Sequence, residues 1–268
     1  METAGYIALF FVGLLLGTLG GGGSILSVPI LVYLFSLDIV TATAYSLFIV
    51  GTASLVGSVL KYGTRMIHIR TGMVFGIPSL ATIFVTRNRI IPSIPEVVLR
   101  TDNFSCTKRT VILIMFAVLM ILVSMAMIAP HTQMMRKKNQ TSTLYMVVAG
   151  IVTGFLTGLV GAGGGFIIIP VLLYLTGLPF KTVVGTTLLI ISVNSFAGFT
   201  GDVFNRSIDW PFLLVITGLA VSGIFIAGYF TQKLANDQLR TAFGWLVLAT
   251  GLMVLLREVS FGFGLVFV

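Results

Sequence analysis

Long uninterrupted apolar runs constrain this chain more than any other feature of its sequence. A helix needs about 20 apolar residues to cross the hydrocarbon core of a bilayer. Runs that approach or exceed this length lie at 5–35, 39–60, 72–86, 110–129, 144–175, 181–200, 211–230 and 240–256. Only 9% of the residues are charged, against about 25% in soluble domains. We therefore expect an all-α polytopic membrane protein with about eight hydrophobic segments.

Two details qualify this expectation. The 72–86 run is short and contains Pro78, which makes it the weakest candidate span. The first run has neither a basic region before it nor a small-residue cleavage site after it, so we interpret it as a retained span and not as a signal peptide. The single cysteine, Cys106, excludes a disulfide within the chain and makes a cysteine-based metal site unattractive.

The net charge of +8 comes from basic residues that stand between apolar runs. They include Arg87, Arg89, Arg100, Lys108, Arg109, Arg136, Lys137 and Lys138. This is the distribution of loops that flank membrane spans, whereas a nucleic-acid-binding domain clusters its basic residues on one folded face. We therefore expect the lipid bilayer as a partner, and no nucleic acid.

The sequence contains an internal duplication. Residues 13–37 and 154–178 align without a gap, and the same register continues beyond them. The apolar runs that contain them, 5–35 and 144–175, are too long for one plain span. The matched residues include Gly13 with Gly154, Gly17 with Gly158, Gly20 with Gly161, Gly22 with Gly163, Gly23 with Gly164, and Pro29 with Pro170. We predict two homologous transmembrane halves, 1–130 and 143–268, joined by a polar basic linker, 131–142. Each half opens with a glycine-broken helix that either crosses the membrane or is re-entrant.

Consecutive glycines near the middle of both long runs are the principal candidates for a binding site. They are Gly20, Gly21, Gly22 and Gly23, followed by Ser24, and then Gly161, Gly163, Gly164 and Gly165. Each glycine costs a helix about 1 kcal/mol relative to alanine, so a cluster of them should unwind it. The half-helix that follows offers free N–H groups and a positive dipole end, which attract an anion. The pairs spaced as Gly-x-x-x-Gly at 13–17 and 154–158 are better explained by close helix packing.

Other candidates lie near these breaks. Ser46, Thr186, Thr187 and Asn194 could line the substrate path, although interhelical hydrogen bonds would also explain them. Pro29 and Pro170 each remove one backbone donor, and we predict them as helix-break residues. Lys61 and Asp202 occupy equivalent repeat positions and could form a gating pair, although solvation at the ends of spans is the simpler explanation.

Catalytic groups and cofactor motifs are not apparent. Ile25 and Phe166 stand where a dinucleotide-binding loop needs its last glycine, and no Gly-Lys-Ser/Thr follows. We find neither a buried carboxylate pair nor a nucleophile with a nearby histidine, and no cluster of His, Cys or Asp suited to a metal. We therefore predict no enzyme activity, no cofactor and no metal.

The glycine segments resemble those of the sulfite exporter TauE/SafE family. The resemblance rests on GTLGGGGSILSVPIL (17–31) and GLVGAGGGFIIIPVLLYLTGLPFKTVVGTTL (158–188). The basic, proline-containing stretch at 86–95 looks like the loop that closes the third helix, and 208–214 looks like the start of the matching helix in the second half. The resemblance implies a multi-pass permease of the inner membrane for sulfite, organosulfonates or related sulfur oxyanions.

Taken together, these patterns predict a secondary transporter that holds a small sulfur-containing oxyanion at the glycine segments near the bilayer centre. A passive anion channel and a membrane assembly protein without transport activity are the alternatives. The Gly-x-x-x-Gly faces permit a homodimer.

Overall fold

The computed structural model describes residues 2–62, 66–93, 95, 97–101, 104–128, 142–160, 163–203, 208–231 and 235–262. Its helices are α1 (Glu2–Leu19), α2 (Gly22–Tyr33), α3 (Ile39–Tyr62), α4 (Ile69–Val85), the π-helical turn η1 (Thr86–Ile90), α5 (Ile91–Ser93), α6 (Lys108–Ile128), α8 (Thr143–Val160), α9 (Gly165–Thr176), α10 (Phe180–Val203), α11 (Trp210–Thr231) and α12 (Asn236–Gly262). A short antiparallel hairpin, β1 (Val97–Thr101) and β2 (Phe104–Thr107), precedes α6. The predicted linker, apart from Ser142, lies outside the described residues.

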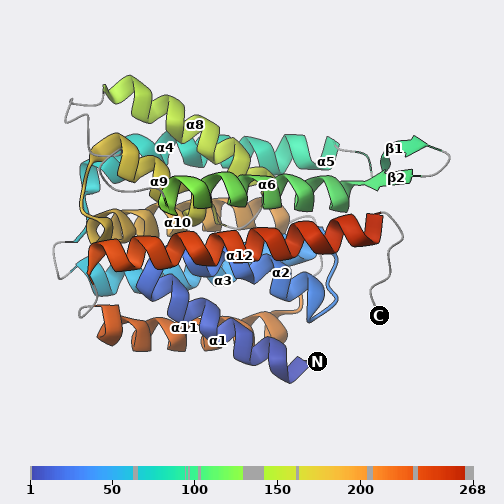
Figure 1. The fold of residues 1–268 in the computed structure, drawn as a ribbon, viewed down its shortest axis with the longest axis horizontal. Coiled ribbons are helices and arrows are strands. Elements are labelled where there is room, and N and C mark those ends of the chain that lie inside the picture. Colours follow the sequence, from blue (N-terminus) through green and yellow to red (C-terminus); the bar gives the residue numbers. More distant parts are fainter. Residues whose placement is uncertain are drawn as a thin grey trace.

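The helices form a bundle (Figure 1) whose outer surface carries many large apolar side chains. Within the described part of the chain, seven helices are long and apolar enough to cross a membrane, and three shorter apolar helices accompany them. Large apolar side chains such as Phe11, Ile77, Leu122 and Leu256 are exposed on the outside of the bundle. Such a surface suits lipid and not water. The prediction of an all-helical polytopic membrane protein is confirmed.

The weakest predicted span is a complete one. α4 begins at Ile69, continues through Pro78, and is extended by η1 and α5 into a candidate span over Ile69–Ser93. The basic stretch after residue 85, predicted as a closing loop, is therefore a continuation of the helix as far as Ser93. A π-helical turn replaces the expected loop at Thr86–Ile90.

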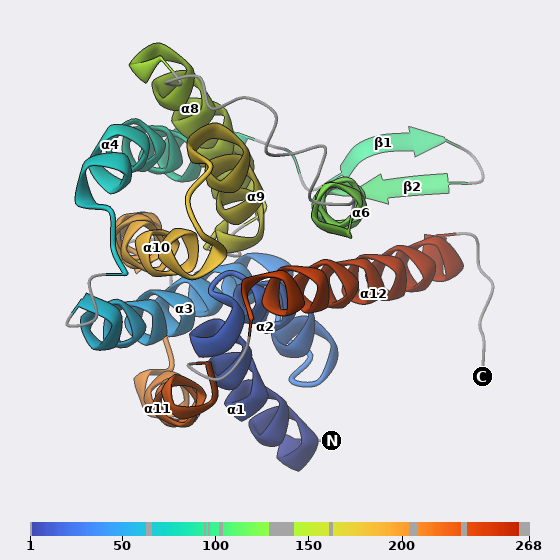
Figure 2. The ribbon, with the colours of Figure 1, turned by 60° about the vertical axis from the view of Figure 1, so that its left-hand side comes forward.

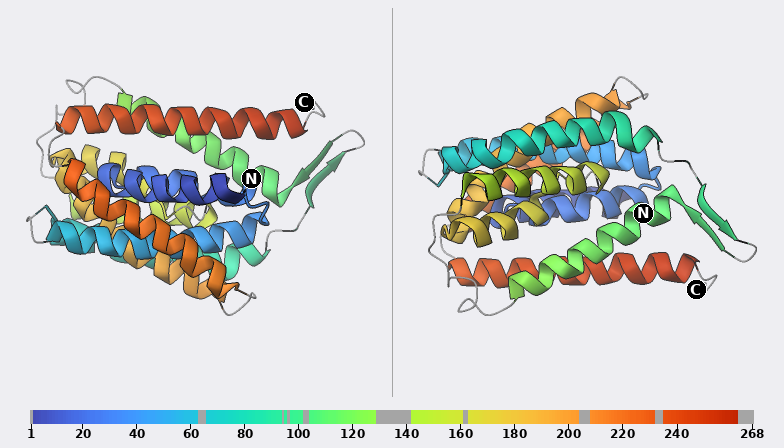
Figure 3. Two further views of the ribbon diagram at one scale, coloured as in Figure 1. Left: turned by 90° about the horizontal axis from the view of Figure 1, so that it is seen from below. Right: turned by 90° about the horizontal axis from the view of Figure 1, so that it is seen from above.

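Two central helices organise the bundle. In both α3 and α10, 72% of the most apolar stretch is buried, the highest share of any candidate span. α1 packs on α11 at one side of this pair, and α4 packs on α8 at the other, while α6 and α12 form a separate pair (Figure 2). Figure 3 shows α6 and α12 together along one edge of the bundle.

The central helices α3 and α10 run in opposite directions. Gly51 lies against Ser195, a Cβ added at Gly198 would meet Leu47, and one added at Gly57 would meet Leu188. Rising numbers on one helix thus meet falling numbers on the other. Any two residues that occupy equivalent positions near the ends of α3 and α10 therefore lie at opposite ends of the bundle.

The small residues of the Gly-x-x-x-Gly pairs are helix contacts. A Cβ added at Gly13 would collide with the backbone of Ala220, and one added at Gly154 would collide with the backbone of Ser79. These two contacts are equivalent, because the ungapped alignment of the halves pairs both glycines and both of their partners. Likewise, Gly17 lies against Ala227 and Ile224, while Gly158 lies against Thr86 and Ile83.

The first glycine-broken run turns back on itself. α2 packs along α1, with Gly23 against Leu16 near the turn and Gly5 against the ring of Phe35 at the far ends. α1 and α2 therefore form a re-entrant helical hairpin and not one transmembrane helix. Because the turn lies inside the bundle, its irregular backbone is covered by protein, as a membrane requires.

Candidate functional site

The two glycine breaks are narrower than the glycine clusters that form them. Gly20 has φ of +73°, and Gly163 and Gly164 have φ of +66° and +72°, values that favour glycine because it lacks a Cβ. α2 already begins at Gly22, and α9 begins at Gly165. We refer to residues 20–21 as the first break and to residues 163–165 as the second break. Gly161 lies outside the described residues.

The two breaks touch each other through their backbones. A Cβ added at Gly165 would lie 2.5 Å from Cα of Gly21, and one added at Gly21 would lie 2.6 Å from the backbone nitrogen of Phe166 while colliding with the carbonyl of Gly165. No side chain larger than a hydrogen atom fits between them. The glycine segments of the two halves therefore meet at Gly21 and Gly165.

This contact brings the N-terminal ends of α2 and α9 together. Gly21 and Gly164 are their N-cap residues, and neither helix has a side-chain cap. The first N–H groups of a helix have no partner within it, and its N-terminus carries about half a positive charge. At the C-terminus of α1, by contrast, Gly20 and Gly21 donate to the carbonyls of Leu16 and Leu19. We call the place where these two N-terminal ends meet, at Gly21 and Gly165, the crossing. It is a favourable location for an anion.

One face of α10 runs along both breaks. Val184 lies beside Gly20, Ile191 beside Gly165, and Ser195 beside Gly163. Thr187 is three residues after Val184 and four before Ile191, so it shares this face. Its hydroxyl is fully buried and has no hydrogen-bond partner. Of the predicted residues, Thr187 thus faces the crossing with an unused hydroxyl.

The hydroxyls of Ser24, Ser27 and Ser46 in the first half are engaged with each other or with the backbone. Ser24 donates to the carbonyl of Gly21 at 2.7 Å, and Ser27 donates to the carbonyl of Ser24 at 2.8 Å. The hydroxyls of Ser27 and Ser46 are hydrogen-bonded at 2.5 Å. Ser24 and Ser46 therefore hold α2 in place against the first break and α3.

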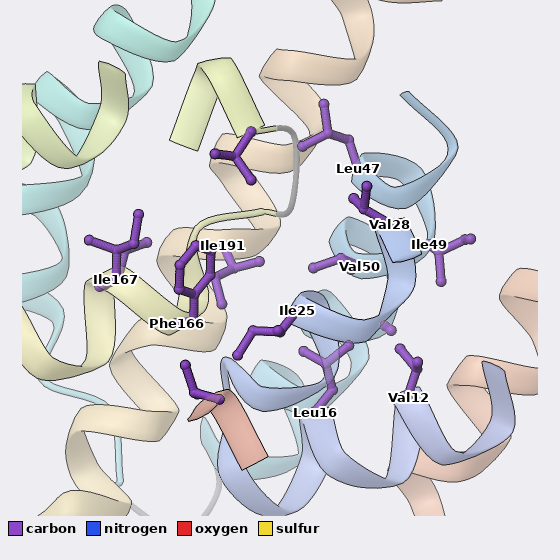
Figure 4. Packing of buried hydrophobic residues seen from close by; sticks show 14 of the residues in the cluster. Val12, Leu16, Ile25, Val28, Leu47, Ile49, Val50, Phe166, Ile167 and Ile191 are labelled. Carbon is purple, nitrogen blue, oxygen red and sulfur yellow. The ribbon is translucent and has the colours of Figure 1, made fainter. Parts of the chain in front are cut away.

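Apolar side chains enclose the crossing. Figure 4 shows Phe166 and Ile191 on one side of the view, with Ile25, Val28 and Val50 on the other. All five side chains are almost completely buried. The crossing is thus screened from water, which strengthens any interaction between its N–H groups and a charged ligand.

Thr186 and Asn194 both make contacts with α4. Thr186 accepts a hydrogen bond from the backbone N–H of His68 at 2.9 Å and donates to the carbonyl of Thr182. It therefore supports the start of α4, away from the breaks. Asn194 donates to the hydroxyl of Ser79 at 2.8 Å, and its other amide atom, Oδ1, is buried without a partner.

Two sequence predictions need correction. Pro29 and Pro170 lie inside α2 and α9, which continue to Tyr33 and Thr176. The helices break at the glycines, because a positive φ reverses the chain, whereas a proline removes only one donor and is tolerated in membrane helices.

The predicted gating pair is the second correction. Lys61 is in the last turn of α3 and Asp202 is near the end of α10. Because these helices are antiparallel, the two residues lie at opposite ends of the bundle. The partner that the structure gives Asp202 is Arg87 of η1, at 3.0 Å, with both side chains buried. The sequence interpretation placed Arg87 in a flanking loop. One sequence signal was available: Arg87 directly follows the apolar run 72–86, and no turn residue separates it from that run. This indicates that the helix continues through Arg87.

These features define a multi-pass helical membrane protein whose only broken helices within the described ranges meet at the centre of the bundle. The sequence profile of the family described as sulfite exporter TauE/SafE matches residues 5–254. The chain therefore belongs to this family.

Curated relatives share almost the full length of the chain. A probable membrane transporter protein of Xylella fastidiosa is 27% identical over 256 residues, covering 92% of this chain and 92% of the relative. The probable membrane transporter protein YdhB of Bacillus subtilis is 24% identical over 250 residues, covering 93% of this chain and 98% of its own. No solved structure matches the chain. The family is thus one of membrane transporters.

Proposed function

We propose that this protein is a secondary transporter of small sulfur-containing oxyanions, such as sulfite or organosulfonates, in the inner membrane. The observation that carries the proposal is the backbone contact between Gly21 and Gly165. It joins two uncapped helix N-termini inside a buried apolar shell, where their positive ends repel one another and attract an anion to the free N–H groups beside the contact. Membership of the sulfite exporter family supports the sulfur chemistry.

We further propose that residues 1–130 and 143–268 are inverted repeats. Tyr45 accepts a hydrogen bond from the N–H of Asp209 at 2.8 Å, and Thr186 accepts one from the N–H of His68 at 2.9 Å. The ungapped alignment pairs the two acceptors with each other and the two donors with each other. Inverted repeats are a common basis for alternating access, in which one half rocks against the other around a central site. The meeting of the two breaks provides such a site.

Flux measurements on the purified protein test the proposal. In liposomes, we expect saturable uptake of sulfite or methanesulfonate that is accelerated by exchange against the same anion trapped inside. A carrier gives this acceleration, whereas a passive channel does not. Folded protein that moves none of these anions would contradict the proposed function.

The binding site can be tested in the same assay. Gly165→Leu should abolish exchange, because no side chain fits against Gly21, while the protein still inserts in the membrane. Gly218→Leu is the matched control, since nothing lies within 4 Å of a Cβ added there. Normal exchange by Gly165→Leu would exclude the crossing as the site.

A further inference from the structure

We propose that the anion is bound asymmetrically, at the second break alone, by the hydroxyls of Thr157 and Ser195 with Asn194 beside them. This inference rests on the proposed function and names the residues of its site. It is carried by the side chains that surround the two breaks, which differ between the halves.

Thr157 and Leu16 show this difference most directly. Thr157 of α8 lies against Gly164, and Leu16 of α1 lies against Gly23. The alignment of the halves pairs Thr157 with Leu16 and Gly164 with Gly23, so the two side chains occupy corresponding places. Thr157 presents a hydroxyl to the second break, whereas Leu16 presents a side chain without polar atoms to Gly23, in the first turn of α2.

Two unpartnered hydroxyls lie at the second break, and a third unpartnered polar atom belongs to the residue that precedes one of them in α10. Ser195 lies beside Gly163, with its hydroxyl 3.1 Å from where a Cβ would stand. The hydroxyls of Thr157 and Ser195 are buried without hydrogen-bond partners, and so is Oδ1 of Asn194. Thr157 and Asn194 are 1% exposed and Ser195 is fully buried. Buried polar groups normally have partners, so their concentration here points to a ligand that supplies them.

The corresponding positions of the first half lack these groups. Leu16 and Ala53 correspond to Thr157 and Asn194, and neither has a polar side-chain atom. Ser46, which corresponds to Thr187, is hydrogen-bonded to Ser27. Ser54, which corresponds to Ser195, is the exception: its hydroxyl is also buried without a partner. Ser54 therefore serves as the matched control for Ser195.

Neutral groups at the second break select the charge of the ligand. The side chains nearest to its three glycines are Val50, Thr157, Ile191 and Ser195. None of them is charged, and the hydroxyls and N–H groups are dipoles only. The cost of burying an unpaired ion rises steeply with its charge, so this set of donors suits a monovalent oxyanion and not a dianion.

Asn194 can serve such an anion as a donor. Its amide bonds Ser79 through one end, and a hydroxyl can either donate or accept. The amide can therefore present its NH2 group to a ligand while its oxygen accepts from Ser79. A sulfonate or hydrogensulfite anion would then receive donors from α8, α9 and α10.

Three near-isosteric variants of the full-length protein test the inference in liposomes, with methanesulfonate and sulfite as probes. Thr157→Val and Ser195→Ala should each raise KM about tenfold, the usual effect of losing a hydrogen bond to a charged group. Ser54→Ala should stay within about twofold of wild type. Because each variant removes a hydroxyl without a protein partner, its Tm in detergent should not fall. Methanesulfonate should compete with sulfite, and sulfate should not.

The outcomes separate this inference from the proposed function. Normal wild-type exchange with equal KM for Ser54→Ala and Ser195→Ala, and no effect of Thr157→Val, would overturn the asymmetric site and leave the transporter standing. Equal competition by sulfate would overturn the selection by charge. If the wild type moves no probe, the anion-dependent rise in Tm decides: its loss in Thr157→Val supports the site without transport, and its absence in the wild type overturns the site.

Discussion

Arg87 and Asp202 form a buried ion pair, with Nη1 of Arg87 donating to Oδ2 of Asp202 at 3.0 Å. The same nitrogen donates to the hydroxyl of Thr43 at 3.3 Å. The three residues belong to η1, α10 and α3, so the pair ties the π-helical turn to both central helices. It lies at one end of these helices, and the corresponding residues Gly228 and Lys61 cannot form such a pair at the other.

Breaking this ion pair should cost far more stability than removing a nearby surface charge. Asp202→Ala deprives a buried guanidinium of its carboxylate, and we expect a loss of about 3 kcal/mol or more. The double variant Arg87→Met/Asp202→Ala should lose less than the sum of the single variants. Arg89→Ala, on the exposed side of the same turn, is the control and should change stability by about 0.5 kcal/mol at most. Unfolding titrations in detergent measure all four, and additive losses would show that the pair contributes little.

Most of the helices and the region of each break could be predicted from the sequence because both depend on local chemistry. Runs of apolar residues predict spans, and consecutive glycines such as Gly163 and Gly164 predict a turn. The Arg87–Asp202 pair could not be predicted in this way, since its members are far apart along the chain and no periodic pattern links them.

The duplication predicted only part of the site. It predicted one glycine break in each half, and it placed Lys61 opposite Asp202 in the alignment. Equivalent positions do not meet, however, when the central helices are antiparallel. Thr157 was missed because it looks like one more residue of an apolar helix. The informative signal was its replacement of Leu16, a polar residue in one copy only.

The contact between the breaks should tolerate no added methyl group. Gly165→Ala puts a Cβ 2.5 Å from Cα of Gly21, so the two halves must move apart, and overpacking of this kind costs about 1–3 kcal/mol. We expect reduced Tm and loss of anion exchange. Gly218→Ala, with nothing within 4 Å of its added Cβ, should gain up to about 1 kcal/mol from helix propensity. Equal behaviour of the two variants would show that the breaks do not touch.

Tyr45 and Thr186 should act as structural supports and not as substrate ligands. Each hydroxyl accepts the backbone N–H that precedes a helix of the other half, Asp209 before α11 and His68 before α4. Tyr45→Phe and Thr186→Val should therefore each lower stability by about 1 kcal/mol without changing KM. Thermal unfolding and liposome flux measure the two effects. A rise in KM for Thr186→Val alone would return Thr186 to the binding site.

The packing of α6 on α12 can be tested by crosslinking. A Cβ added at Gly244 would lie 3.1 Å from Cβ of Met127, and a disulfide needs about 3.5–4.5 Å, so a small shift allows the bond. In a Cys106→Ser background with a protease site in the linker, Met127→Cys/Gly244→Cys should keep both halves joined on a non-reducing gel after cleavage.

Met125 provides the matched control for this crosslink. It is on the same helix but is 65% exposed, so Met125→Cys/Gly244→Cys should separate into two fragments after cleavage. For this control pair to crosslink, α6 and α12 would have to rotate about their axes. The close contacts of Gly251 with Met120 and Ala117 oppose such a rotation. Equal crosslinking by both pairs would mean that α12 does not pack against this face of α6. The two halves would then be joined through the packing of α1 on α11, α3 on α10 and α4 on α8.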